Sequence, residues 1–192
     1  IGGLAGDALT TSSHNTAIGY SSQSSATIGT GNTSVGFQTL HTNVDGSKNV
    51  AIGHNALYSL EPASAIDMYN TAVGYAAGVA MTTGNENTII GGLAGDALTT
   101  GSANVAVGYL ALSAEDAHGT NTAIGFKTLR VQDAGANAYN VAVGYQAGEN
   151  VTTATDNVLV GAFAGDALTT GPYNVAIGRS ALSLEDAYGY NV

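Results

Sequence analysis

β-Branched residues recur at alternate positions of a short motif that begins with asparagine. In residues 104–109 the motif reads NVAVGY, and closely similar stretches return from one end of the chain to the other. Motif position 2 is Thr or Val, position 4 is Ile or Val, and position 3 is usually Ala. This alternation is typical of a β-strand. It places positions 2 and 4 on one face of the strand and position 3 on the other.

The motif recurs at a nearly constant interval. Eight of the ten intervals between motif asparagines are 17 residues, whereas the interval after Asn49 is 21 and that after Asn121 is 19. Insertions confined to one part of a repeat lie on one face of a repeat stack. We therefore expect a specific site, if there is one, at the insertions (61–69 and 131–139), in the irregular repeat at 15–31, or at a tip outside this segment. The motif asparagines are Asn15, Asn32, Asn49, Asn70, Asn87, Asn104, Asn121, Asn140, Asn157, Asn174 and Asn191.

Two further features concern the turns between motifs. Position 5 is glycine in every complete copy, which predicts a corner that needs a positive φ or a close backbone approach. Four residues later the chain carries Leu in two successive repeats and then Gly in two, which groups the repeats in fours and gives a superunit of 70 residues between Asn87 and Asn157. These alternating residues are Leu40, Leu57, Gly78, Gly95, Leu112, Leu129, Gly148, Gly165 and Leu182.

A 17-residue unit fits one coil of a parallel β-solenoid. Helical-pair repeats need more residues, and the leucine-rich pattern is absent. Two short strands and tight corners would fill each coil, and coils would stack about 4.8 Å apart. The sequence thus predicts an all-β protein with one continuous repeat array over 1–192, about eleven coils in a rod on the order of 50 Å long.

This fold predicts ladders of equivalent residues along the rod. We expect the Ile and Val side chains of position 4 to form a buried row, and the motif asparagines to form a corner ladder whose amides bond the neighbouring backbone. The small Ala of position 3 either tolerates crowding inside the coil or lines a face that another subunit approaches. A thin coil encloses little core, so a narrow rod gains stability by association.

Composition narrows the possible partners. Only 9% of residues are charged, the formal net charge is −10, and cysteine is absent. The negative charge disfavours nucleic acid or an anionic membrane surface as a partner. The absence of cysteine excludes disulfides and thiolate metal sites. No apolar run is long enough to span a membrane, and the chain starts and stops within a repeat, so we expect a segment of a longer chain.

The polar residues predict no catalytic, cofactor or metal site. The four histidines, His14, His41, His54 and His118, share no repeat position and have no partner at a metal-ligand spacing. The recurrent aspartates of GDALTT (Asp7, Asp96 and Asp166) are interpreted as turn-capping residues. Glycosidases need two carboxylates that face each other across a cleft. The pairs Glu115–Asp116 and Glu185–Asp186 are instead adjacent in sequence, so we do not expect an enzyme.

Aromatic residues occupy motif position 6, just after the corner glycine. Exposed rings in a row can stack on sugar rings, which gives a carbohydrate-binding interpretation. The favoured interpretation is structural: a ladder that caps the core or forms a seam between subunits. The candidate contact residues are Tyr20, Phe37, Tyr75, Tyr109, Phe126 and Tyr145.

The recurrent NxAIGxxA pattern resembles the head repeats of trimeric autotransporter adhesins. The NVAVGYQAG stretch at 140–148 resembles repeats in phage tail fibres. The resemblance covers the whole chain, although the 17-residue unit is longer than the usual adhesin-head unit. It implies a left-handed β-roll, with three identical chains side by side.

Three functions follow, in order of preference. The first is a structural fibre segment, the shaft or head of a phage tail fibre or bacterial surface adhesin. It would be extracellular, have copies of itself as partners, and support attachment to a host glycan or receptor. The second is a carbohydrate-binding module that uses the aromatic row. The third is an ice-binding solenoid, suggested by Thr at position 2; this hypothesis is weak because Val alternates with Thr there.

Overall fold

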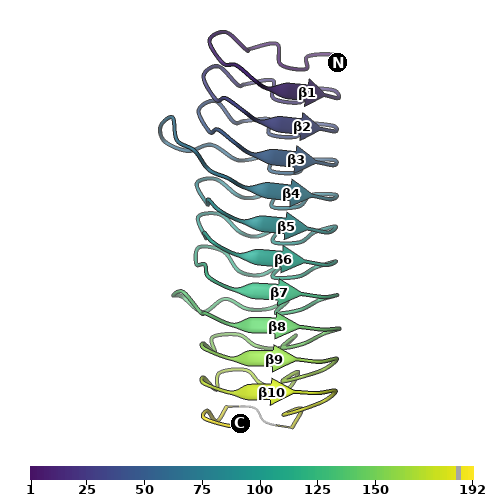
Figure 1. Cartoon of the computed structure of the whole chain (residues 1–192), viewed down its shortest axis with the longest axis vertical. Coiled ribbons are helices and arrows are strands. Elements are labelled where there is room, and N and C mark those ends of the chain that lie inside the picture. Colours follow the sequence, from purple (N-terminus) through teal and green to yellow (C-terminus); the bar gives the residue numbers. More distant parts are fainter. Residues whose placement is uncertain (185–186) are drawn as a thin grey trace.

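The computed structural model describes residues 1–184 and 187–192 and is a β-solenoid. Ten strands form one parallel sheet in chain order, each strand pairing with the next (Figure 1). The strands are β1 (Thr16–Ile18), β2 (Thr33–Val35), β3 (Val50–Ile52), β4 (Thr71–Val73), β5 (Thr88–Ile90), β6 (Val105–Val107), β7 (Thr122–Ile124), β8 (Val141–Val143), β9 (Val158–Val160) and β10 (Val175–Ile177).

Equivalent motif positions stack directly on one another, as the 17-residue period predicts. Between β6 and β7, Val105 pairs with Thr122 and Ala106 with Ala123. The two longer repeats keep this register, because Ile124 of β7 still pairs with Val143 of β8. The extra residues instead form loops that project from the same side of the rod, after β3 and after β7 (Figure 1). The predicted all-β parallel solenoid and the placement of the insertions on one side of the rod are confirmed.

Each described coil that contains a complete motif has one strand of three residues. The prediction of a second strand in each coil is therefore wrong. The reason lies in three backbone positions of each coil that adopt the left-handed conformation. In the repeats around β6 these are Ala103 (φ 58°), Leu110 (φ 53°) and Leu112 (φ 53°). A positive φ interrupts an extended strand, so the rest of the coil consists of turns.

The corner glycine of position 5 has the predicted positive φ. At Gly108 φ is 135°, and a Cβ atom there would lie 2.3 Å from the carbonyl oxygen of Gly125 in the next coil. Side-chain atoms cannot approach a carbonyl this closely. The glycine is therefore required both for its conformation and for the close stacking of coils.

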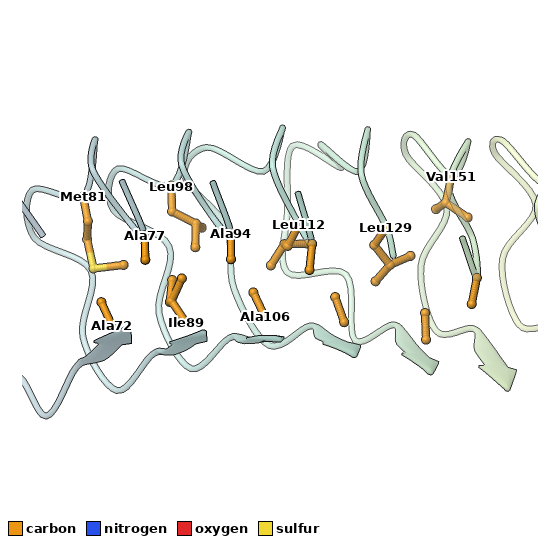
Figure 2. Close-up of a cluster of buried hydrophobic side chains, with 14 of the residues drawn as sticks. Ala72, Ala77, Met81, Ile89, Ala94, Leu98, Ala106, Leu112, Leu129 and Val151 are labelled. Carbon is orange, nitrogen blue, oxygen red and sulfur yellow. The ribbon is translucent and has the colours of Figure 1, made fainter. Parts of the chain in front are cut away.

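The core is filled by position 3 from one side and by the turns from the other. Figure 2 shows Ala72 and Ala106 pointing inward from the strands, opposite Met81 and Leu112. All four side chains are completely buried. Ala at position 3 therefore lies inside the coil, which decides between its two predicted roles.

The alternation of Leu and Gly follows from this narrow interior. The alternating Leu or Gly is motif position 9, four residues after the corner glycine. Where position 9 is Leu112, the facing residue is the small Ala106, and both are fully buried. Where position 9 is Gly95, the space is taken by Ile89 and Leu98: a Cβ atom on Gly95 would lie 2.8 Å from a methyl group of each. A close-packed core keeps its volume nearly constant. At Gly78 and Gly148, where position 3 is also Ala, the space is therefore taken by leucines of other coils, Leu57 and Leu129 of the coil before among them.

The prediction that position 4 forms a buried row is wrong. Positions 2 and 4 share a face, as predicted, but it is the outer face: Ile52, Ile90 and Ile124 are each 38–39% exposed. The interior of a 17-residue coil is already filled by Ala and by the turn residues. It has no room for a β-branched row as well.

The asparagine corner ladder is confirmed. The side-chain oxygen of each motif asparagine accepts a hydrogen bond from the backbone N–H of the next, as from Asn32 to Asn15 at 2.8 Å. The amide N–H of most members also donates to the backbone one coil further on, as Asn70 does to the Gly84 carbonyl at 2.8 Å. Across the described residues, no helix has the length and apolar character needed to cross a membrane.

Candidate functional site

The outward strand face is the side of the sheet formed by positions 2 and 4 of β1–β10. Its residues are only Thr, Val and Ile, so the face carries no charge over all ten strands. Every one of these side chains is partly or fully exposed, from Thr16 and Ile18 at one end to Val175 and Ile177 at the other. A contiguous apolar surface of this kind is characteristic of an interface rather than of a free surface.

The face is also regular. Because the strands are in register, position 4 forms one row of Ile and Val and position 2 forms a parallel row. Position 2 is Thr in five strands and Val in the other five. Hydroxyl groups are therefore interspersed with methyl groups along the row, which does not give the continuous threonine array that the ice-binding hypothesis needs.

The six predicted aromatic residues lie in one exposed row, and the rings stack on one another. Tyr20, Phe37, His54 and Tyr75 form one stack, with ring centroids 4.8–5.6 Å apart and interplanar angles of 15–27°. A second stack joins Tyr109, Phe126 and Tyr145, and the edge of Phe163 meets Tyr145. His54 thus fills an aromatic position of the row.

The rings are partly exposed. Exposure ranges from 37% for Phe126 to 60% for Tyr75, so the rings are not part of the buried core, and a cap over the core or a seam between subunits both stay predictions. Stacking covers the ring faces that a sugar would need. The stacks begin at Tyr20 and Tyr109, each of which lies over a glycine of the preceding coil: a Cβ atom on Gly3 or Gly92 would be 3.5 or 3.6 Å from the ring.

The first insertion, residues 61–69, is attached to the coil before it by a polar cluster. Lys48 Nζ lies 2.7 Å from an Asp67 carboxylate oxygen and 3.0 Å from the Tyr69 hydroxyl. The hydrogen bond to Asp67, and to a lesser extent the bond to Tyr69, raises the pKa of Lys48. The hydrogen bond from Lys48 in turn lowers the pKa of Asp67. Both charged groups are solvent-exposed, so the pair fixes the loop rather than forming a buried site.

The second insertion, residues 131–139, brings Asp133, which the sequence analysis did not single out, close to Glu115 and His118, which it treated separately. The potential ligand atoms of these three side chains all lie within 4.8 Å of one another. The available signals were the spacing of three between Glu115 and His118, and the position of Asp133 one repeat after Asp116. The other acidic pair of the sequence, Glu185 and Asp186, lies outside the described residues.

Comparisons of the chain with protein-family models, with curated protein sequences and with solved structures found no match. The assignment of a function therefore depends on the outward strand face, the aromatic row and the second insertion.

Proposed function

We propose that the chain is a shaft segment of a homotrimeric extracellular fibre, in a phage tail fibre or a bacterial surface adhesin. Its role is mechanical: it holds a receptor-binding part away from the particle or cell. The observation that carries the proposal is the outward strand face, an uncharged Thr/Val/Ile surface that runs along all ten strands. The resemblance of the repeats to adhesin heads and tail fibres supports the same function.

The shape of this face favours copies of the same chain as partners. Both partners in such an interface present rows with the same spacing along the rod, so every coil meets an equivalent coil. Closed rotational symmetry buries the same patch on every copy. Three rods around a common axis would bury the Ile18, Ile90 and Ile124 row, together with its neighbours, away from water.

Rigidity of the shaft would come from two ladders that run along the axis. Backbone hydrogen bonds join successive coils at the strands and the corners, for example from Val105 to Asn121 at 2.8 Å. The asparagine ladder adds a side-chain bond at every coil. In a linear stack each coil is stabilised mainly by its neighbours, so identical bonds at every step give uniform stiffness.

The mass of the protein in solution tests this proposal. The chain is 19.0 kDa, and light scattering is expected to give three times that mass. The double substitution Ile90→Lys/Ile124→Lys places two charges on the outward strand face and should give monomers with an unchanged far-UV circular dichroism spectrum. Thr83→Lys, at an exposed position of a turn outside that face, is the matched control and should stay trimeric. A monomeric wild-type chain would contradict the proposal.

Carbohydrate binding is a second candidate, restricted to the ends of the aromatic stacks. One face of the Tyr109 ring lies over Gly92 rather than over another ring. This face can therefore accept a sugar ring with little rearrangement. Tyr20 has the same position over Gly3. On a glycan array, the double substitution Tyr20→Ala/Tyr109→Ala should therefore remove any signal, and Tyr145→Ala, whose ring already contacts neighbouring rings on both sides, should keep it. A signal that survives the double substitution would exclude binding at these stack ends.

A further inference from the structure

A cluster of three metal-ligand side chains bridges two coils at the second insertion. Glu115 and His118 lie in the turn between β6 and β7, and Asp133 lies in the turn between β7 and β8. The Nδ1 atom of His118 is 3.5 Å from a Glu115 carboxylate oxygen. The ligand atoms of all three residues lie within 4.8 Å of one another.

These distances suit a shared ion better than direct hydrogen bonds. Nδ1 of His118 is shielded from solvent and has no hydrogen-bond partner among the described residues. Two ligands about 2.0–2.2 Å from a tetrahedral metal lie about 3.3–3.6 Å apart, close to the separation of His118 Nδ1 and the Glu115 oxygen. Asp133 is exposed, so its carboxylate can move the remaining distance at little cost.

Glu115 is fixed and buried, as a first ligand should be. Its side chain is completely inaccessible to solvent, and one carboxylate oxygen accepts a hydrogen bond from the backbone N–H of His118 at 3.2 Å. A buried carboxylate is costly unless it is paired or coordinates a metal. The side chains of His118 and Asp133 are partly exposed, which leaves a fourth position open to water.

The repeat itself supplies a natural comparison. His118 lies in the stretch ALSAEDAHG, and the nearly identical stretch ALSLEDAYG follows one superunit of 70 residues later. The position of His118 is taken there by Tyr188. One coil after Glu115 the chain has Gln132, which is also fully buried. Each replacement removes a ligand, so within the described part of the chain the complete ligand set occurs at one place in the rod.

We propose that Glu115, His118 and Asp133 bind one Zn²⁺ ion, with water as the fourth ligand. A set of one imidazole and two carboxylates suits zinc and related transition ions, whereas Ca²⁺ and Mg²⁺ take mainly oxygen ligands in larger number. The ion would join the coil of β6 to the coil of β7 and fix the base of the second insertion. This inference does not depend on the proposed fibre function.

Titration of the EDTA-treated chain with ZnCl₂, followed by calorimetry and thermal denaturation, tests the proposal. One Zn²⁺ per chain should bind and raise the melting temperature, and Co²⁺ should give the visible absorption of a four-coordinate site. Ca²⁺ and Mg²⁺ should not raise the melting temperature. Loss of one ligand should weaken binding by at least about tenfold, since even outer-shell changes weaken metal sites by that factor.

Three variants and one control make the result specific. His118→Tyr and Glu115→Gln copy residues that the chain already uses at equivalent positions. Asp133→Asn changes an exposed side chain, so it tests the site even if the other two variants fold poorly. His54→Ala removes an exposed histidine of the aromatic row and should bind Zn²⁺ like the wild type. Absence of saturable 1:1 binding, or equal binding by Asp133→Asn and the wild type, would overturn the proposal.

Discussion

The side-chain oxygen of Asn87 accepts a hydrogen bond from the backbone N–H of Asn104 at 2.9 Å. The side chain of Asn104 in turn accepts from Asn121 at 3.0 Å and donates to the carbonyl of His118 at 3.2 Å. Asn104 is completely buried. A single side chain therefore satisfies two backbone groups of the following coil, of which the Asn121 N–H is buried. This explains why asparagine is invariant at this position along the chain.

Replacing this asparagine should destabilise the solenoid strongly. Asn104→Ala leaves the Asn121 N–H and the His118 carbonyl without these partners, and each unsatisfied buried group costs about 1–3 kcal/mol. We expect a loss of about 2–5 kcal/mol in the free energy of unfolding by chemical denaturation. Asn85→Ala, at a half-buried asparagine outside the ladder, is the control and should lose less than about 1 kcal/mol. Equal losses in both variants would argue against the ladder.

The volume exchange between positions 3 and 9 can be tested by a double-mutant cycle. Ala106→Ile should overpack the coil against Leu112 and cost about 1–3 kcal/mol, while Leu112→Gly should leave a cavity and cost about 2–5 kcal/mol. The double variant recreates the Ile89–Gly95 pair found one coil earlier. Its loss in unfolding free energy should be smaller than the sum by at least about 1 kcal/mol. Simple additivity would show that the two positions do not share space.

The buried carboxyl of Glu115 should make stability depend on pH. Burial raises the pKa of Glu115 from 4.5 to about 7, assisted by the charges of Asp133 and Asp116 and opposed by the hydrogen bond from the His118 backbone. The folded chain therefore keeps a proton that the unfolded chain loses. Between pH 4.5 and 7 the free energy of unfolding should fall as pH rises, by about 3 kcal/mol at most, and then level off.

The comparison with Glu115→Gln isolates this effect. Both proteins are measured in EDTA, so that bound metal does not favour the ionised carboxylate. The stability of the wild type relative to the variant should decline from pH 4.5 to 7, because Gln cannot ionise. Parallel pH profiles for the two proteins would mean that Glu115 titrates in the folded chain as it does in the unfolded chain.

The fold was predictable from the sequence because its determinants are periodic. The 17-residue interval, the alternation around Ala106 and the invariant corner at Gly108 each predict the parallel solenoid and its register. The direction of the strand faces was not predictable from alternation alone. Alternation separates positions 2 and 4 from position 3, but which face is buried depends on what the turns place inside, such as Leu112 and Leu98.

The turns themselves were harder to predict. Left-handed backbone occurs at residues as different as Ala103, Leu112 and Tyr139, because stacking on the neighbouring coil, rather than side-chain preference, imposes it. For the same reason the cluster at the second insertion had no clear sequence signature. Asp133 meets Glu115 and His118 only because successive coils are stacked, so residues far apart in sequence become neighbours.

The central claim is that three chains pack through the outward strand face, and oxidative cross-linking tests this claim most directly. The chain has no cysteine, so a single substitution reports one place in the rod. Val107→Cys lies on the outward strand face, whereas Thr83→Cys lies in a turn outside it. If three chains pack through this face, oxidation should link Val107→Cys copies into covalent dimers at low protein concentration and leave Thr83→Cys copies unlinked. Failure of Val107→Cys to cross-link, or equal cross-linking of both variants, would contradict the proposed assembly.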